Sequence, residues 1–171
     1  ALTLRRGESG TLLYQLLQEK LISLNPGVVT VDNVDQVIAK IENVRNNIEG
    51  NAEVLAWLRG ERSIFIEGEK RQRNVTVIDF EHPANNAFHV TDEWQYTNGL
   101  HQWDKKTNRP DVIFLINGIP VAIVETKSAK RADGIEQGLT QIRRYHRETP
   151  EMLTAPQIFD VTHLIDFYYG V

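Results

Sequence analysis

The chain has 171 residues, 41% of them hydrophobic, no cysteine and a formal net charge of −4. This composition suits one compact core, and no run approaches the roughly 18 apolar residues that a membrane-spanning helix needs. The lack of cysteine excludes disulfides, thiolate catalysis and cysteine-based zinc sites, and the acidic balance argues against a generally basic coat for nucleic acid.

Helical spacing of apolar residues dominates the first third of the chain. Ser9 can cap a helix over roughly residues 10–24, in which leucines recur at that spacing. Asp32 or Asn33 opens a second helix, whose apolar side runs from residue 34 to residue 48. A short third helix is predicted after Asn51.

The apolar pattern then changes to that of strands. Strands are predicted for residues 63–66, 75–80 and 88–97, with a charged loop over 67–74. An apolar hairpin over 112–124 follows, then a helix from Asp133 to about Arg147, and closing strands over 157–161 and 163–169. Helices, a run of strands, a helix and further strands indicate an α/β sandwich with a mixed β-sheet.

The apolar hairpin carries charge at its two ends. Asp111 stands at its start, and Glu125 and Lys127 stand at its end. Two carboxylates can bind a hard divalent cation such as Mg²⁺, and a lysine can stabilise developing charge or orient a nucleophile. A salt bridge at a strand end is the simpler interpretation of acid-x-lysine alone. The preceding Pro-Asp and the hairpin spacing favour a site that cuts phosphodiesters.

The length of the hairpin loop decides whether these acids can meet. Glu125 and Lys127 are two residues apart, so their side chains share one face of a strand. A two-residue turn at Asn117-Gly118 without any bulge would turn Asp111 to the opposite face from Glu125. We therefore predict either an odd-length loop or a bulge near Asp111 that corrects the register.

Positive charge is concentrated around this hairpin. Residues 101–150 contain nine Lys and Arg against six Asp and Glu, although the whole chain is acidic. Basic and polar side chains that could contact a DNA backbone follow the hairpin, namely Lys130, Arg131, Gln141, Arg144 and Tyr145. The last three lie near one stripe of the predicted helix, and an ordinary solvated face is the simpler interpretation of that spacing.

Arg109-Pro110-Asp111 through Glu125-Thr126-Lys127, followed by Gln141-x-x-x-Tyr145, resembles the PD-(D/E)xK nuclease superfamily. More narrowly, the chain resembles the N-terminal nuclease domain of the R (motor) subunit of type I restriction enzymes. Further segments that carry this likeness are Leu24-Asn25-Pro26, Ile78-Asp79-Phe80, Asn85-Asn86-Ala87-Phe88 and Ile116-Asn117-Gly118-Ile119-Pro120. The likeness covers nearly the whole chain.

The resemblance implies a restriction-endonuclease-like α/β sandwich, with a mixed β-sheet flanked by helices, that cleaves double-stranded DNA endonucleolytically with Mg²⁺ or Mn²⁺. By this resemblance, the metal-binding acids are Asp111 and Glu125, the catalytic lysine is Lys127, and Gln141 and Tyr145 form an auxiliary motif. Many family members add an acid from an early helix. Here Glu8, Glu19 and Glu42 are candidates, and so is a residue before Ala1.

The resemblance also implies a larger assembly. Residues 1–171 are expected to form a single nuclease domain, a fragment from the N terminus of a motor subunit. The chain lacks Gly-x-x-x-x-Gly-Lys-[Ser/Thr], so ATP is assigned only to a downstream motor region. Expected partners are double-stranded DNA and the methylase and specificity subunits of a cytoplasmic complex. A RecB-like exonuclease, a junction resolvase and a degenerate nuclease fold used for subunit docking stay open as alternatives.

Overall fold

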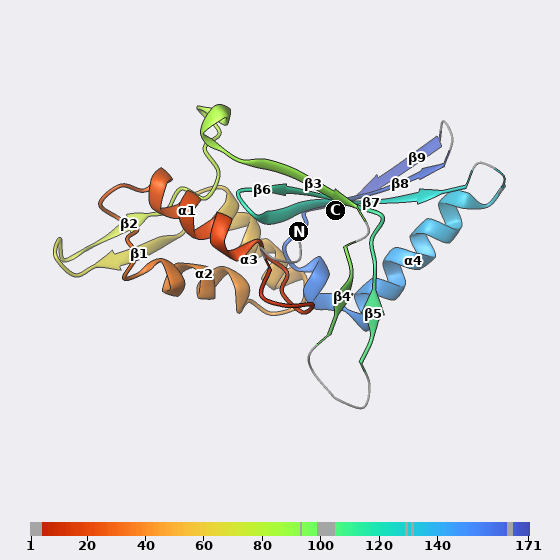
Figure 1. Cartoon of the computed structure of the whole chain (residues 1–171), viewed down its shortest axis with the longest axis horizontal. Coiled ribbons are helices and arrows are strands. Elements are labelled where there is room, and N and C mark those ends of the chain that lie inside the picture. The colour runs from red at the N-terminus through yellow and green to blue at the C-terminus, as the bar shows by residue number, and fades with distance from the viewer. Residues whose placement is uncertain (1–4, 93, 99–104, 129, 131, 164–165) are drawn as a thin grey trace.

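The computed structural model describes residues 5–92, 94–98, 105–128, 130, 132–163 and 166–171 (Figure 1). Its helices are α1 (Tyr14–Leu24), α2 (Val34–Glu42), α3 (Ile48–Leu58) and α4 (Gly134–Glu148), with short 3-10 turns η2 (Pro83–Asn85) and η3 (Pro150–Leu153). Its strands are β1 (Ser63–Ile66), β2 (Arg71–Asn74), β3 (Phe88–Asp92), β4 (Tyr96–Thr97), β5 (Thr107–Asn108), β6 (Val112–Ile116), β7 (Ile119–Lys127), β8 (Ile158–His163) and β9 (Asp166–Gly170).

A five-stranded mixed sheet organises the molecule, with strand order β3-β6-β7-β8-β9. Neighbouring strands are antiparallel except β7 and β8, which are parallel and are joined by a crossover that contains α4. Helix α4 packs against β7 and β8. This arrangement confirms the predicted α/β class, a mixed sheet flanked by helices as in a restriction-endonuclease-like fold.

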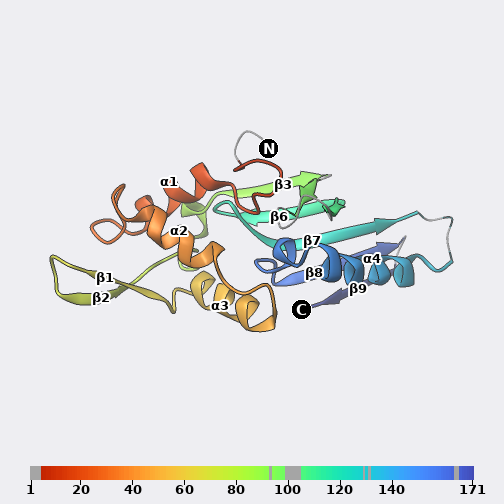
Figure 2. The ribbon, with the colours of Figure 1, turned by 90° about the horizontal axis from the view of Figure 1, so that it is seen from below.

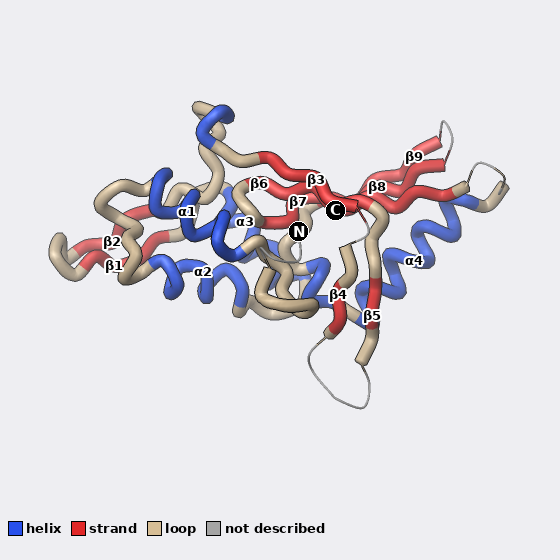
Figure 3. Tube along the Cα trace, in the orientation of Figure 1, coloured by secondary structure: helices blue, strands red, loops and turns tan. Residues whose placement is uncertain are grey.

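Buried apolar side chains form two clusters. The first joins α1, α2 and α3 to Val75, Val77 and Ile119, and the second lies between α4 and the sheet, around Ile123 and Val161. Figures 2 and 3 show α1–α3 gathered at one end of the molecule and α4 against the strands at the other. The helices at the first end therefore support the hairpin turn, whereas α4 covers the strands that carry the acids and the lysine.

The helix boundaries differ from those predicted. Helix α1 starts at Tyr14, and Ser9 caps no helix. Asn33 does precede α2, but α2 ends at Glu42, so the predicted apolar side to residue 48 is divided between two helices. Helix α3 begins before Asn51, because the Asn47 side chain accepts a hydrogen bond from the Gly50 N–H at 3.0 Å and caps the helix there.

The prediction of a strand over residues 75–80 is wrong. Val75 and Val77 are buried in the helical cluster, and β2 lies instead in the predicted charged loop, where it pairs with β1. Side chains satisfy the backbone in place of a neighbouring strand. The Thr76 N–H donates to Asn25 Oδ1 at 2.7 Å, and the Asp79 N–H donates to Asn86 Oδ1 at 2.9 Å.

The predicted strand over 88–97 divides into β3 and β4, with residue 93 outside the described residues. Strand β3 joins the main sheet, whereas β4 pairs with β5 in a separate ribbon. The predicted closing strands correspond to β8 and β9, each displaced by a few residues. Within the described ranges, no helix is long and apolar enough to cross a membrane.

The β6–β7 hairpin has a two-residue turn and a bulge. Asn117 and Gly118 both have positive φ, and Ile116 pairs with Ile119, so the predicted odd-length loop is wrong. Phe114 pairs with Ala122 whereas Leu115 pairs with Pro120, which leaves Val121 as an extra residue in β7. The predicted correction by a bulge is confirmed, although the bulge lies beside the turn and not near Asp111.

Buried amides fix this turn to the rest of the chain. Asn117 is fully buried, and its Nδ2 donates to the Val77 carbonyl and to Asn86 Oδ1, each at 2.8 Å. Its Oδ1 accepts the Ala87 N–H at 2.8 Å. The Gly118 carbonyl accepts the Leu13 N–H at 2.8 Å, just before α1. Several motifs that carried the family resemblance therefore hold the hairpin in place, at a distance from its charged end.

Candidate active site

The charged end of the hairpin lies beneath α4. Beyond the bulge Val112 pairs with Val124, and this register places Asp111 opposite Glu125. Glu125 and Lys127 share the face of β7 that carries buried Ile123, and this is the face that α4 covers. The bulge therefore brings the acid before β6 and the acid and lysine of β7 to one place.

Glu125 is the most deeply buried member of the cluster, with no exposed surface. Its Oε1 accepts the Tyr145 hydroxyl at 2.8 Å, and its Oε2 accepts Lys127 Nζ at 3.0 Å. Burial raises the pKa of Glu125, the hydrogen bonds from Tyr145 and Lys127 oppose that rise, and the charge of Asp111 adds to it. A cation beside this carboxyl therefore favours its charged form.

Lys127 lies between the two carboxylates. Its Nζ is 3.0 Å from Glu125 Oε2 and 4.0 Å from Asp111 Oδ2, and it donates to Gln141 Oε1 at 2.8 Å. The side chain is only 14% exposed. A positive charge already occupies the position between the acids, as expected where carboxylates converge in a largely dry site.

Thr126 orients Asp111, a contact that the sequence reasoning missed. The backbone N–H of Thr126 donates to Asp111 Oδ2 at 2.8 Å, and its hydroxyl donates to the same oxygen at 3.0 Å. The Asp111 side chain is 37% exposed, so it is the open side of the cluster. Alternation along β7 directs Thr126 away from the Glu125 face, and the sequence held no signal for this contact.

Helix α4 contributes the glutamine and the tyrosine. Gln141 and Tyr145 are one helical turn apart, and Gln141 Nε2 donates to the Tyr145 hydroxyl. The Tyr145 oxygen lies 2.8 Å from Glu125 Oε1 and 3.2 Å from the Arg109 carbonyl, so its one proton is best placed on Glu125. Burial raises the pKa of Tyr145, which keeps it a donor.

The other predicted basic residues differ in how near they lie to this cluster. Arg144 forms an ion pair with Glu148 at 3.7 Å and is half-exposed, and its guanidinium lies over the Tyr145 ring, 5.6 Å from the ring centroid. Lys130 is exposed in the loop after β7, and Arg131 lies outside the described residues. The structure thus brings together Asp111, Glu125, Lys127, Gln141 and Tyr145, with Arg144 at the border of this cluster beside Tyr145.

No early acid reaches the cluster in the described part of the chain. Glu8, Glu19 and Glu42 are exposed, and the charges that shift the pKa of Glu125 belong to Asp111 and Lys127. Among described residues, no group of three or more His, Asp or Glu side chains could hold a metal ion. Asp111 and Glu125 offer carboxylate oxygen, the type of ligand that a hard cation such as Mg²⁺ accepts.

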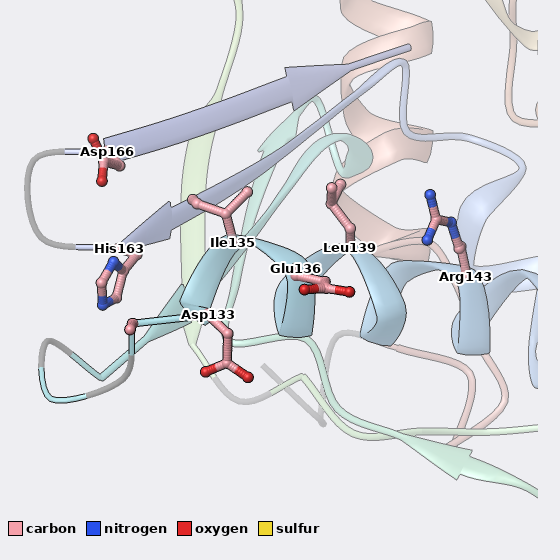
Figure 4. Close-up of a pocket in the computed structure, with 8 residues that line it drawn as sticks. Asp133, Ile135, Glu136, Leu139, Arg143, His163 and Asp166 are labelled. Atoms are coloured by element: carbon pink, nitrogen blue, oxygen red, sulfur yellow. The ribbon is translucent and has the colours of Figure 1, made fainter.

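A cavity lies beside this cluster. Figure 4 shows it between α4 and the β8–β9 hairpin, lined by Asp133, Glu136, Arg143, His163 and Asp166 among others, with a volume of about 510 Å³. His163 pairs with Lys127 across β7 and β8, so the cavity is one strand away from the lysine. None of the five clustered residues lines it.

Comparison with known proteins gives a family match over almost the full chain. The family described as "Type I restriction enzyme R protein N terminus" matches residues 2–169. A Methanocaldococcus jannaschii protein provisionally named type I restriction enzyme MjaIXP endonuclease subunit is 31% identical over 142 residues, which are 80% of this chain and 13% of that protein.

Two bacterial relatives give a similar picture. The type I restriction enzyme HindI endonuclease subunit of Haemophilus influenzae is 29% identical over 160 residues, 89% of this chain and 14% of that protein. The type I restriction enzyme EcoprrI endonuclease subunit of Escherichia coli is 31% identical over 85 residues, half of this chain and a quarter of that protein. The chain thus spans a small part of the relatives it matches.

Proposed function

The chain belongs to the family of the type I restriction enzyme R protein N terminus, and we propose that it is the part of such a protein that cleaves double-stranded DNA endonucleolytically with Mg²⁺. One observation carries the proposal. Lys127 Nζ lies between the carboxylates of Asp111 and Glu125, at the covered end of an apolar hairpin. Charge grouped in this way at a dry strand end is typical of a catalytic cluster.

The donor set fits the proposed cation. Asp111 and Glu125 offer only carboxylate oxygen, which Mg²⁺ and Mn²⁺ accept and which a soft metal site would not use alone. A bound ion would polarise the scissile phosphate and make a nearby water easier to deprotonate. These two residues would hold it, Glu125 from its fixed position under Tyr145 and Asp111 from the open side.

The other residues of the cluster act on orientation and charge. Lys127, directed by Gln141, would face the reacting phosphate, stabilise the negative charge that develops on it and orient the attacking water. In the hydrolysis the water oxygen forms a bond to phosphorus, one phosphorus–oxygen bond to a sugar breaks, and the departing oxygen takes up a proton. Tyr145 keeps Glu125 in position through that change.

The larger assembly is part of the proposal. Residues 1–171 act as a single cytoplasmic nuclease domain, in a polypeptide whose remaining sequence supplies the ATP-dependent movement of DNA. Methylase and specificity subunits would be its partners, and a partner subunit would select the DNA site, as the family resemblance implies. The length of the relatives, of which this chain spans 13–14% in two cases, supports such a division of labour.

Replacement of Lys127 tests the proposal. In the assembled restriction complex with ATP, Mg²⁺ and circular plasmid, Lys127→Ala is expected to lower the cleavage rate roughly 100-fold or more, while ATP hydrolysis continues. Lys40→Ala, which changes an exposed lysine on α2, should cleave as the wild type does. Near-normal cleavage by Lys127→Ala would favour a degenerate nuclease fold used for docking. Activity confined to linear DNA would favour an exonuclease.

A further inference from the structure

Among the described residues, no helix lies over β8 and β9 on the side of the sheet away from α4 (Figure 1). The face that holds Ile113, Ile123 and Val161 is buried under α4, and Figure 1 shows α4 on one side of the strands with no helix over β8 and β9 on the other. The register aligns the outward side chains of the second face across all five strands. Its large exposed apolar members are Phe88, Val90, Phe114, Ile158, Phe167 and Tyr169, each 46–69% exposed.

A row of apolar side chains crosses this bare sheet face. Val90 pairs with Phe114, Phe114 with Ala122 and Ala122 with Ile158, so one apolar row crosses four strands. Contiguous apolar surface of this kind marks an interaction site in proteins exposed to water. The parallel pairing of β7 and β8 also indicates an interaction site, because parallel strands are normally covered on both faces.

The chemistry of the face excludes nucleic acid as its occupant. The outward positions of the described strands on this face hold no lysine or arginine, and their charged members are Asp92 and Asp160. DNA binding depends on cations that neutralise phosphates. Glu125 and Lys127 also point to the opposite face, beneath α4. The occupant of the bare face is therefore polypeptide with an apolar surface.

We propose that an amphipathic helix, from the polypeptide that follows this segment in a full-length type I restriction R protein, packs on the bare sheet face. The family description places the segment at the N terminus, and it spans 13–14% of two relatives, so most of those polypeptides lies after it. Strand β9 is an edge strand and contributes Phe167 and Tyr169 to the face. Polypeptide that leaves β9 starts at the border of the apolar surface.

A helix fits this surface better than a strand does. The inner strands already have their backbone groups paired on both sides, so the face offers side chains and no backbone donors. Asp92 and Asp160 favour lysine or arginine along the polar flanks of the helix. The inference rests on family membership and on the register, and it is independent of the proposed cleavage.

Cysteine labelling of the full-length R protein tests the inference. The single substitutions Phe114→Cys and Phe65→Cys, read by mass spectrometry of the peptide that carries each new thiol, give matched reporters at native side chains that are 46% and 48% exposed. Phe65 lies in β1, which belongs to a separate two-stranded sheet with β2. We expect iodoacetamide to modify the new thiol of Phe114→Cys roughly tenfold or more slowly than that of Phe65→Cys in the native protein, and both equally after denaturation.

The other occupants give distinct results in the same experiment. Equal labelling of the two variants in the native full-length protein would overturn the inference. Protection of Phe114→Cys that disappears on dilution would assign the face to a second copy of the protein. Protection that needs added DNA or another subunit would assign the face to that partner. Either result would overturn the inference that a helix of the same polypeptide covers the face. Combining Phe114→Cys with Lys127→Ala should leave the protection unchanged, which separates this inference from the nuclease proposal.

Discussion

At the scale of single residues, Thr126 is the contact that gives Asp111 its direction. Two donors of one residue, the N–H at 2.8 Å and the hydroxyl at 3.0 Å, converge on Asp111 Oδ2. The second carboxylate oxygen stays available to a cation. One of these two hydrogen bonds comes from the backbone N–H of Thr126, so a substitution can remove only the one from its hydroxyl.

Thr126→Val removes that hydroxyl without changing the shape of the side chain. Loss of one hydrogen bond to a partly exposed carboxylate costs about 1 kcal/mol, so the Mg²⁺ concentration for half-maximal cleavage should rise roughly fivefold. The rate at saturating Mg²⁺ should change little. Plasmid cleavage by the assembled complex against Mg²⁺ concentration measures both, and Thr126→Ser should restore the wild-type curve. Serine behaving as valine does would contradict the positioning role.

Asp79 makes a contribution to stability that depends on pH. It accepts hydrogen bonds from the Asn85 side chain and from the His82 and Glu81 N–H groups, and chiefly the Asn85 bond lowers its pKa below 3.8. A lowered carboxyl pKa stabilises the fold above the unfolded value, and this stability is lost as pH falls through the folded value.

Asp79→Asn should therefore be less stable than the wild type at pH 7, and the difference should shrink as the pH falls below about 4. Urea unfolding at pH 7 and pH 3.5 measures the change. Asp32→Asn, at an exposed position where no described contact donates a hydrogen bond to the carboxylate, serves as the control. A gap between Asp79→Asn and wild type that is the same at both pH values would contradict this assignment.

Some residues of the site could be predicted from the sequence and others could not. Acids and a lysine at the ends of an apolar hairpin indicate a metal site, because charge beside strands that exclude water is costly unless it is paired or binds a metal. Thr126 could not be predicted, since strand alternation directs it away from Glu125. The place of Arg144 at the border of the cluster, over the Tyr145 ring, could not be predicted either, because spacing alone does not show which residues a helix turns toward the sheet.

At the scale of elements, the approach of α4 to β8 sets the position of Gln141 and Tyr145. Gly138 lies so close to β8 that a Cβ there would stand 2.2 Å from Val161 Cγ1. Val161 is fully buried, so it has no space to move into. A glycine in mid-helix thus permits the tight packing that brings the polar side of α4 to Glu125.

Gly138→Ala is expected to destabilise the protein. Alanine favours the helix by about 1 kcal/mol, but overpacking a buried contact costs about 1–3 kcal/mol and, at 2.2 Å, the upper part of that range. The net loss should be about 1–2 kcal/mol, measured by chemical denaturation. Thr140→Ala, at an exposed position of the same helix, should be neutral or slightly stabilising. Stabilisation by Gly138→Ala would show that α4 can withdraw from β8.

Elements that a local residue pattern specifies were predicted correctly. Segments whose hydrogen-bond partners lie far away in the sequence were not. The β6–β7 hairpin follows from two apolar runs around Asn117-Gly118, and its register argument required either an odd-length loop or a bulge near Asp111, whereas the bulge lies at Val121. Residues 75–80 carry the composition of a strand, yet Asn25 and Asn86 satisfy that backbone from elsewhere in the chain. No local sequence pattern predicts such partners. The tertiary contacts therefore decided the structure of this segment against its local preference for a strand.

At the scale of the whole molecule, the site and the bare sheet face lie on opposite sides of one sheet. Helix α4 and the acid–lysine cluster take one side, and the exposed apolar row takes the other. A relative of which the 142 matched residues are only 13% has ample chain to cover that surface. The sequence resemblance led to the fold, but only the register identifies which side is uncovered.

Residues 1–171 alone should cleave DNA weakly or not at all. The polypeptide that we propose covers the bare sheet face is missing from this segment, as are the motor and the subunits that would bring DNA to Asp111. Incubation of the segment with supercoiled plasmid and Mg²⁺ measures this, with its Lys127→Ala variant as the background. Fast cleavage that Lys127→Ala abolishes would contradict the dependence on other parts of the enzyme.

The extra residue in β7 makes the hairpin tolerant of a deletion and sensitive to an insertion. Ala122 already pairs with Phe114, so loss of the half-buried Val121 would join Pro120 to Ala122 in a regular ladder and leave Asp111 opposite Glu125. One residue added between the bulge and Glu125 would instead turn Glu125 and Lys127 to the other face of the strand. A single-codon insertion there would separate all of the converging charge in one step, whereas each point substitution removes one member and leaves the others in place.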